Sequence, residues 1–374
     1  MDNKYKSVLI SHIAIPSNKI GSWNLMLTDL IDVNDSIFEY IISPKPDFLS
    51  KRPKNIIVQN SIKFCEKILF KIAGNRYLEK KQYWYPIRKI LRKEDKLVLN
   101  VIDNIGILNA LHYYACKENL RDRIFINFFF HGYFIDIDLI KIQTNFSLDK
   151  LVLLTNTSYQ NLLDKSNVLP FEVAILPNGI KPNFKKVSYE EKLALRNELG
   201  FKSNKHYFLW VSQDRPKKGL KIILNAWKKV ASENTNIELL IIGVNQKGKK
   251  NNIEYLGRIP NNLLPKYYQI ADYFLFSTLC HEGHPLSLTE ALKSGLKCIV
   301  SDIDPLSEIL HNGNLGYLVD KPNMVDSWAA SISFVLNNNY NFNKENIDLN
   351  YLYNFESWKS RFLEILNQSK QNFN

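Results

Sequence analysis

The sequence predicts an α/β protein with two doubly wound domains, and three observations predict this fold class. The chain has 374 residues, more than one ordinary hydrophobic core holds. Short apolar runs rich in β-branched and aromatic residues alternate with helical stretches almost throughout, which is typical of parallel sheets with crossover helices. The segment 177–182 interrupts this alternation with two prolines and an Asn-Gly pair, through which neither a helix nor a strand can pass.

The expected elements follow the chain in order. In the first half, strands are expected at 7–13, 38–42, 55–58, 97–102, 124–130, 151–154 and 173–176, with helices between them, for example at 22–31 and 105–115. In the second half, strands are expected at 207–211, 238–242, 253–256, 273–276, 298–300 and 317–319, and helices at 218–231, 262–271 and 286–294. The asparagine-rich stretch 336–350 is expected to form a loop. Phe355, Trp358 and Phe362 then show helical spacing, so the helix 355–366 should dock onto another surface.

Composition excludes several classes of protein. Hydrophobic residues make up 45% and charged residues 23% of the chain, which is ordinary for a globular protein and argues against disorder. The 4 cysteines form no CxxC pair, so neither a zinc site nor a disulfide framework is indicated. No apolar run approaches the ~18 residues of a membrane span, and the start of the chain lacks a signal-peptide pattern. The expected location is cytoplasmic, or peripheral on the inner face of the membrane.

The net charge of +12 is concentrated in one segment. Residues 51–96 contain 14 Lys and Arg against 4 Asp and Glu, interleaved with aromatic residues, and 80–93 could form a helix whose apolar residues are flanked by cations. Such stretches bind anionic membrane surfaces, although a solvated basic face is an equal alternative. Binding of nucleic acid would require a recognisable module, and none of the usual motifs is present.

Cations gather where the strand 207–211 ends. Arg215, Lys217 and Lys218 follow it and precede a helix. Because a helix start by itself favours negative charge, cations beside it make sense if an anion such as a diphosphate binds there. A solvated basic turn is the alternative.

Two carboxylates flank the next strand–helix junction. Glu282 and Gly283 form a turn after the strand 273–276, Pro285 presets the first helical turn, and Glu290 lies about one turn inside the helix. A glycine at this place lets a ligand approach the backbone closely. The two glutamates could therefore reach one polyhydroxylated ligand from two positions, although helix capping and surface charge also explain such residues.

A histidine follows a buried strand of the first half. His131 and Gly132 come after Phe128–Phe130, so the imidazole should project above the carboxyl edge of the sheet. A lone histidine of this kind is more often structural. His12, His112 and His206 have no supporting context, and His284 could either contact a ligand or pack against its turn.

Taken in this order, these junctions resemble the retaining glycosyltransferases of family 4, which have the GT-B fold. The resemblance covers most of the chain and is dense from 151 to 319. The segments that carry it are Ile175–Ile180 followed by Phe184 (the "PNG-hydrophobic" linker), Lys218–Leu220 (the "KG" phosphate turn), 253–258 and 271–275 (around the nucleobase pocket), Glu282 to Glu290 (the paired glutamates), and 355–366 (the terminal helix).

The resemblance implies a role for each of these residues. Lys218 and Arg215 would neutralise the diphosphate of the donor, together with backbone N–H groups that follow Gly283. His284, Pro285, Leu286 and Ser287 complete this donor-binding segment. Glu290 would bind the ribose hydroxyls, and Arg258 and Ile259 would border the base. Glu282 would hold the transferred sugar, and His131 would face that sugar from the other domain. No metal or other cofactor is expected, and no protein nucleophile is required.

The sequence departs from the family pattern at three places. Ser212-Gln213 stands where the family has Gly-Arg, and Arg215 lies closer to Lys218 than the arginine of the family pattern does. The loop 17–23 has a single glycine, Gly21, where many members have two, and Gly21 is expected near the phosphates. His284 replaces the usual aromatic residue.

The complete expectation is a GT-B fold, with two Rossmann-like domains facing across a cleft and a C-terminal helix that crosses back to the first. The acceptor-binding domain would contain residues 1–180 with the helix 355–374, and the sugar-nucleotide domain residues 181–354. The enzyme would transfer a hexose-type sugar from a UDP-, GDP- or ADP-sugar to a saccharide or lipid-linked acceptor in cell-surface polysaccharide or lipopolysaccharide synthesis. A sugar-nucleotide epimerase of the same fold and a non-catalytic sugar-nucleotide-binding subunit are the alternatives.

Overall fold

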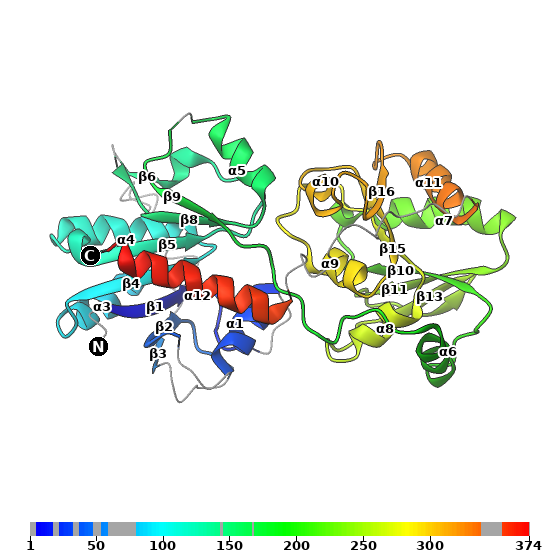
Figure 1. Cartoon of the computed structure of the whole chain (residues 1–374), viewed down its shortest axis with the longest axis horizontal. Helices are drawn as coiled ribbons and strands as arrows, with labels where there is room; N and C mark the ends of the chain where they lie inside the picture. The colour runs from blue at the N-terminus through cyan, green and yellow to red at the C-terminus, as the bar shows by residue number, and fades with distance from the viewer. Residues whose placement is uncertain are drawn as a thin grey trace. The chain divides into compact units, whose positions relative to one another are not determined.

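The computed structural model describes residues 5–17, 22–32, 37–47, 54–58, 80–142, 145–166, 168–337 and 354–373. The chain divides into two compact units (Figure 1). Unit 1 comprises Met1–Pro177 and Glu356–Asn374, and unit 2 comprises Asn178–Phe355. Unit 1 is therefore discontinuous, because all of unit 2 stands in the sequence between its last helix and the rest of it.

Unit 1 is built on a seven-stranded sheet with the order β3-β2-β1-β4-β5-β8-β9, in which all neighbouring strands run parallel. Its strands are β1 (Tyr5–Ser11), β2 (Tyr40–Ser43), β3 (Lys54–Ile57), β4 (Lys96–Ile102), β5 (Ile124–Phe129), β8 (Lys150–Leu153) and β9 (Glu172–Ile175). Its helices are α1 (Ser22–Asp32), α3 (Lys81–Leu91), α4 (Ile105–Lys117), α5 (Asn156–Leu163) and α12 (Phe355–Gln371). A two-stranded ribbon is formed by β6 (Lys141–Ile142) and β7 (Asn145–Phe146), and short 3-10 turns cover Arg121–Arg123 and Ile137–Ile140. The strand order reverses between β1 and β4, and in open α/β sheets ligands bind at such a reversal.

Unit 2 repeats this plan with the strand order β12-β13-β11-β10-β14-β15-β16. Its strands are β10 (His206–Val211), β11 (Ile237–Ile242), β12 (Lys247–Lys250), β13 (Ile253–Gly257), β14 (Tyr273–Phe276), β15 (Lys297–Ser301) and β16 (Gly316–Val319). Its helices are α6 (Tyr189–Glu198), α7 (Leu220–Glu233), α8 (Leu264–Ile270), α9 (Leu286–Lys293), α10 (Leu306–Ile309) and α11 (Val325–Asn337), and a 3-10 turn covers Pro216–Lys218. Only the edge strand β12 pairs antiparallel among the described strands of this sheet. The reversal of strand order lies between β10 and β14.

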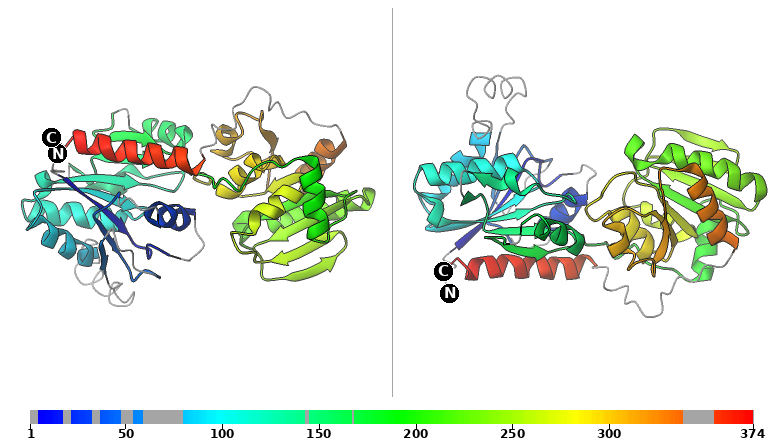
Figure 2. Two further views of the ribbon diagram at one scale, coloured as in Figure 1. Left: turned by 60° about the horizontal axis from the view of Figure 1, so that its bottom comes forward. Right: turned by 90° about the horizontal axis from the view of Figure 1, so that it is seen from above.

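The terminal helix α12 belongs to unit 1, where it lies along the sheet (red in Figures 1 and 2). Its apolar stripe is buried, and the ring of Phe362 lies 5.1 Å from that of Phe129 and 6.0 Å from that of Phe38. At the end of the chain, Phe373 contacts Tyr5 with ring centroids 5.7 Å apart. The predicted docking of this helix onto the first half of the chain is confirmed.

A buried chain of polar side chains ties α12 to the sheet. The hydroxyl of Ser369 donates to Oδ1 of Asn127 at 2.9 Å. Asn127 donates to Asn100 at 2.9 Å, and Asn100 donates to the hydroxyl of Ser7 at 3.1 Å. These four residues are all buried. Since each bond satisfies a group that is shielded from water, the chain selects one position of α12 on the strands.

Replacement of Ser369 by alanine should therefore lower the stability of unit 1. The variant leaves Oδ1 of the buried Asn127 without this partner, and we expect a loss of about 1–3 kcal/mol in the free energy of unfolding. Ser360→Ala is the matched control, since Ser360 lies on the same helix and is exposed. Urea denaturation of the three proteins measures the effect. Equal midpoints for Ser369→Ala and Ser360→Ala would refute it.

The basic segment 51–96 falls partly outside the described residues, which include 54–58 and 80–96 of it. The predicted helix is confirmed as α3, but the expectation that its apolar face is available to a membrane is wrong. Tyr83, Trp84 and Ile87 are at most 1% exposed and belong to the core of unit 1. The interleaved aromatic residues of α3 thus serve packing, and mainly its cations remain at the surface.

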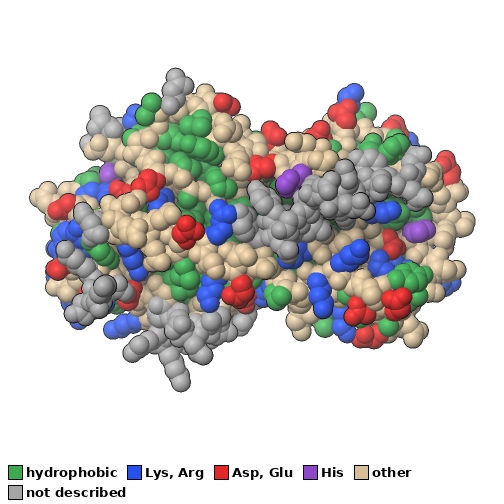
Figure 3. Space-filling view, in the orientation of Figure 1, with side chains coloured by type: hydrophobic (Ala, Val, Ile, Leu, Met, Phe, Trp, Pro, Cys, Tyr) green, Lys and Arg blue, Asp and Glu red, His purple; other side chains and the backbone are tan. Residues whose placement is uncertain are grey.

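The edge of the unit 1 sheet carries an open hollow. Strand β9 and helix α5 enclose about 450 Å³ between them, and apolar side chains gather on this face of unit 1 (Figure 3). The lining residues are Asn156, Tyr159, Leu163, Val168, Leu169, Phe171, Val173 and Ile175.

No helix in the described part of the chain is both long and apolar enough to cross a membrane.

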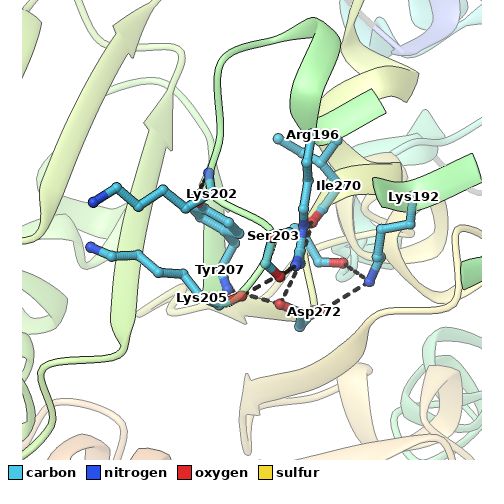
Figure 4. A network of polar contacts seen from close by, with 9 residues as sticks. Lys192, Arg196, Lys202, Ser203, Lys205, Tyr207, Ile270 and Asp272 are labelled. Carbon is cyan, nitrogen blue, oxygen red and sulfur yellow. Dashed lines mark hydrogen bonds and ion pairs between the residues drawn. The ribbon is translucent and has the colours of Figure 1, made fainter. Parts of the chain in front are cut away.

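In unit 2, a polar network fixes the amino ends of two strands (Figure 4). Asp272, just before β14, accepts hydrogen bonds from Arg196 at 2.7 Å, Lys192 at 2.8 Å and the backbone N–H of Tyr207 at 2.9 Å. Arg196 also donates to the carbonyl oxygens of Ile270, Ser203 and Lys205. Asp272 therefore joins α6 to the starts of β10 and β14. It lies at the opposite end of these strands from their carboxyl edge.

Candidate functional site

The cationic turn predicted after β10 is locked onto the loop that follows β14. Gly219 has a φ of +71°, and a Cβ atom at this position would overlap the carbonyl oxygen of Ser277. The hydroxyl of Ser277 donates to the carbonyl oxygen of Lys218 at 2.9 Å, and Trp210 donates to the same hydroxyl at 3.0 Å. The N–H of Leu279 donates to the carbonyl oxygen of Lys217 at 2.7 Å. Two loops at the reversal of strand order are thus held as one rigid body.

Lys218 and Glu282 meet on this platform. The ammonium group of Lys218 forms an ion pair with Oε1 of Glu282. The hydroxyl of Thr278 donates to the same oxygen at 2.8 Å, which fixes the carboxylate from a second side. The side chains of Lys218 and Glu282 are 21% and 17% exposed, so both groups are partly shielded from water yet reachable by a ligand. The structure thus brings together the two residues on which the sequence places the diphosphate and the transferred sugar.

Glu290 lies in a separate group on α9. Its side chain is partly buried, and burial raises the pKa of its carboxyl group to about 7, although the hydroxyl of Tyr268 and the positive charge of Lys181 partly lower it. Burial and the nearby charge of Glu290 in turn raise the pKa of Tyr268 well above its ordinary value. Near neutral pH the Glu290 carboxyl group is therefore present in both protonation states, and it can donate as well as accept a hydrogen bond.

This environment of Glu290 predicts a pH dependence of stability. Between the ordinary value of 4.5 and the folded value of about 7, the folded protein binds more protons than the unfolded chain. The contribution of Glu290 to the free energy of unfolding therefore falls as the pH rises through this window. A glutamine at position 290 does not titrate. The Tm of Glu290→Gln relative to wild type should rise as the buffer is changed from about pH 5 to about pH 8, measured by differential scanning fluorimetry. A constant difference would contradict it.

His284 is buried within the turn that precedes α9. Its side chain is 8% exposed, and burial lowers the pKa of the imidazole to about 4 despite the opposing charge of Glu308. Nδ1 of His284 makes no hydrogen bond to any described residue. Its carbonyl oxygen accepts a hydrogen bond of 2.6 Å from the side-chain amide of Asn178. Of the two expected roles for this ring, the geometry favours packing against the turn.

The other residues predicted to bind the sugar-nucleotide donor lie on the neighbouring loops. Arg215 begins the 3-10 turn and is exposed, and its side chain forms no ion pair with a described residue. Arg258 and Ile259 follow β13, the first of them exposed. Gly283, Pro285, Leu286 and Ser287 form the turn and the first residues of α9. Gly21 lies outside the described residues.

In unit 1, His131 belongs to a cluster of three titratable groups. The register pairs the last residues of β1, β4 and β5, so His12, Asp103 and His131 follow three neighbouring strand ends. The N–H of His131 donates to Oδ1 of Asp103 at 3.0 Å. Nδ1 of His12 is buried and has no hydrogen-bond partner among the described residues. The cluster lies where the strand order of unit 1 reverses.

The pKa values of two groups in this cluster, His131 and Asp103, are shifted from their ordinary values. Burial and the nearby His12 lower the pKa of His131 well below its ordinary value, so this imidazole is neutral. Burial raises the pKa of Asp103, which the hydrogen bond from His131 and the charge of His12 partly offset. Asp103 also has a φ of +46°, a strained conformation for a residue with a side chain. Such strain is concentrated at functional sites, which marks Asp103 as a candidate beside His131.

Unit 2, rather than unit 1, matches a known protein family. Residues 191–349, which lie in unit 2, match the family of glycosyl transferases group 1. The match contains the turn with Lys218 and the segment from Glu282 to Glu290. Unit 2 thus has the sequence pattern of the group 1 family around the candidate site.

Similar proteins agree with this match, and solved structures share the fold. The UDP-Gal:alpha-D-GlcNAc-diphosphoundecaprenol alpha-1,3-galactosyltransferase of Escherichia coli is 26% identical over 200 residues, which is 49% of this chain and 50% of that protein. The chain spans about half the length of the curated relatives it matches first. Sucrose-phosphate synthase from Thermosynechococcus elongatus superposes with a TM-score of 0.70 at 12% identity, covering 97% of this chain and 98% of that one. HepE of Anabaena, in complex with UDP, gives 0.70 at 14% identity, covering 97% and 100%. These structures show the fold, and the predicted GT-B class with two Rossmann-like domains is confirmed.

Several residues of these clusters are absent from the sequence-based candidates. The interpretation of His12 as a histidine without context is corrected by its position beside Asp103 and His131. Asp103 could have been predicted from the sequence, because it directly follows a buried strand, and His131 is singled out for nearly the same position. Tyr268 and Thr278 could not, because only the tertiary fold brings them to Glu290 and Glu282. Among the described residues, no group of three or more His, Cys, Asp and Glu could hold a metal ion.

Proposed function

We propose that this chain is a retaining glycosyltransferase of the family 4 type, which transfers a sugar from a nucleoside-diphosphate sugar to a saccharide or lipid-linked acceptor. The observation that carries the proposal is the Lys218–Glu282 ion pair on a locked platform at the strand reversal of unit 2. The match of residues 191–349 to the group 1 family supports it. The named activity of the E. coli relative, with a UDP-sugar donor and a lipid-linked acceptor, makes UDP the first nucleotide to test.

In this proposal, Lys218 and the start of α9 bind the diphosphate. The ammonium group supplies a positive charge, and the first N–H groups of α9 supply hydrogen bonds. Arg215, which is exposed nearby in sequence, adds a second cation. The carboxylate of Glu282 accepts hydrogen bonds from the sugar, and the carboxyl group of Glu290 binds the ribose hydroxyls. Since Thr278 and Lys218 both hold Glu282, its geometry is set before the donor arrives.

The proposed transfer needs no protein nucleophile. The bond between the anomeric carbon and the phosphate oxygen breaks, and the bond to the acceptor oxygen forms on the same face of the sugar. The acceptor hydroxyl gives its proton to an oxygen of the departing phosphate, so the products are the glycoside and the nucleoside diphosphate. The negative charge on that phosphate grows in the transition state, and Lys218 stabilises it where it develops.

The cluster in unit 1 would bind hydroxyl groups of a saccharide. His131 and Asp103 meet at the carboxyl edge of its sheet, and His12 adds a buried imidazole nitrogen. The neutral imidazole of His131 and a carboxyl group with a raised pKa at Asp103 suit uncharged hydroxyls, which both donate and accept hydrogen bonds.

Contact with an anionic membrane would use the surface cations of α3 and α4. A hollow of about 720 Å³ is lined by Arg88, Leu91, Arg92, Lys117, Glu118, Asn119, Leu120 and Arg123. Arg92 and Lys117 are exposed and form no ion pair with a described residue. With about 1 kcal/mol for each cation near the surface, the variant Arg92→Ala/Lys117→Ala should bind anionic vesicles about thirtyfold more weakly.

Vesicle flotation tests this membrane contact. Lys221→Ala/Lys228→Ala, which removes two exposed cations from α7 in unit 2, is the control and should float like wild type. Equal recovery of wild type with neutral and anionic vesicles would exclude an electrostatic contact of this kind.

A thermal-shift panel of UDP-, GDP- and ADP-sugars tests the proposed function. The true donor should raise the Tm because it binds only the folded protein. Incubation of that donor with saccharide and lipid-linked acceptors should then release nucleoside diphosphate together with a glycoside of unchanged anomeric configuration. Free nucleotide or an isomerised sugar without acceptor would indicate the epimerase instead. No stabilisation by any nucleotide sugar would refute the proposal.

A further inference from the structure

The first residue of unit 2, Asn178, reaches across the fold to the turn before α9. Asn178 follows the point at which the chain leaves unit 1, and its side chain is 3% exposed. Its amide nitrogen donates a hydrogen bond of 2.6 Å to the carbonyl oxygen of His284, which is 106 residues later. Oδ1 of Asn178 has no hydrogen-bond partner among the described residues. The hydrogen bond that this buried amide donates therefore goes to a main-chain carbonyl oxygen of the turn.

That carbonyl group controls how the chain enters α9. Pro285 has no N–H, so the peptide group between His284 and Pro285 offers a single polar atom, the carbonyl oxygen. The side-chain amide of Asn178 donates a hydrogen bond to this oxygen. The bond fixes the plane of this peptide group. Since Pro285 is the N-cap residue of α9, the same plane sets the direction of the first N–H groups of the helix.

The two places at which the chain crosses between the units are joined to the same turn. Ile180 forms a parallel bridge with Asn354, and the N–H of Phe355 donates to the carbonyl oxygen of Ile180 at 3.0 Å. The outgoing and returning segments are thus paired with each other within unit 2. Through Asn178, this paired segment is attached to the residue that precedes Pro285.

We propose that Asn178 is a positioning residue, which holds the turn Glu282–Pro285 in the geometry that binds a diphosphate and couples that turn to both chain crossings. The inference rests on the proposed function, because it gives the start of α9 a diphosphate to bind. Asn178 itself touches neither phosphate nor sugar. Its effect passes through the His284 carbonyl group, so loss of the bond should change ligand affinity more than stability.

The test compares UDP binding and hydrogen–deuterium exchange in three variants. Asn178→Asp keeps the size of the side chain but presents a carboxylate, which cannot donate, to the carbonyl oxygen. Asn178→Ala removes the group altogether. Asn183→Ala is the matched control, because Asn183 lies on the same segment with an exposed side chain. We expect about tenfold weaker UDP binding by calorimetry and faster exchange at amides 286–290 in both position-178 variants, with the control unchanged.

The outcomes separate this inference from the proposed function. Wild-type affinity and exchange in Asn178→Asp would overturn the positioning role. A lowered Tm with unchanged UDP affinity, measured where all proteins are folded, would make Asn178 structural and also overturn it. If wild type binds neither UDP nor another nucleoside diphosphate, the proposed function fails. The exchange at 286–290 then still decides whether Asn178 holds the turn.

Discussion

Lys218→Ala is expected to lower the rate of sugar transfer about 10²–10³-fold while the protein remains folded. The backbone at Lys218 is held in place without the lysine side chain. The hydroxyl of Ser277 donates a hydrogen bond to the carbonyl oxygen of Lys218, and the 3-10 turn continues into Gly219. Removal of the ammonium group therefore takes away the charge opposite the departing phosphate and little of the packing. Initial rates of nucleoside diphosphate release at saturating acceptor measure the effect.

Lys217→Ala is the matched control for this change. Lys217 is adjacent, exposed and equally charged, and its described contacts use the carbonyl oxygen rather than the ammonium group. The control should retain most of the activity. Equal rates for Lys218→Ala and wild type would remove Lys218 from the site, whereas equal losses in both variants would show that only the net charge of the turn matters.

Gly219→Ala is expected to lower the free energy of unfolding of unit 2 by about 2–5 kcal/mol and to abolish UDP binding. The left-handed backbone costs an alanine about 1–2 kcal/mol, and the overlap of its Cβ atom with the carbonyl oxygen of Ser277 adds about 1–3 kcal/mol. Relief of the overlap requires the loops after β10 and β14 to separate. The two loops carry Lys218 and Glu282, so the ion pair should be lost with the platform.

Gly200→Ala separates these two costs. Gly200 has a similar φ of +79°, and a Cβ atom there would meet no heavy atom within 4 Å. This control should lose only about 1–2 kcal/mol and bind UDP normally. Urea denaturation followed by the fluorescence of the buried tryptophans, with calorimetry for UDP, measures both quantities. A Gly219→Ala variant no less stable than Gly200→Ala would show that the two loops are not locked.

The strands of both sheets were predictable for a definite physical reason. Parallel strands buried on both faces are apolar along most of their length, so runs such as β4 and β5 stand out from the sequence even though each contains one asparagine. Strand β12 does not, because its residues are lysine and glycine and all of them are exposed. Residues 247–250 form a strand because they pair with β13, and the residues of β12 themselves give no indication of this pairing. Helix α11 lies outside the expected elements although Trp328, Ile332 and Val335 show helical spacing.

The residues of the candidate site also fall into those that the sequence predicts and those that only the fold reveals. Lys218, Glu282 and His131 follow strand ends, and the order of elements along the chain is enough to single them out. Their partners come from elsewhere in the fold, as Tyr268 does for Glu290 and Asn178 for His284. The basic helix α3 shows the converse error, because an amphipathic pattern cannot distinguish a helix that packs on its own sheet from one that faces a lipid surface.

The discontinuity of unit 1 has a consequence for biosynthesis. A ribosome completes all of the Asn178–Phe355 unit before it makes the residues of α12. Until then, the nascent first unit lacks Trp358 and Phe362, and this helix does not yet cover the apolar surface around Phe38 and Phe129 against which Phe362 packs in the folded protein. During translation the later-encoded unit can therefore finish folding before the earlier-encoded one. The half-made chain should depend on chaperones that shield this apolar surface until the last helix leaves the exit tunnel.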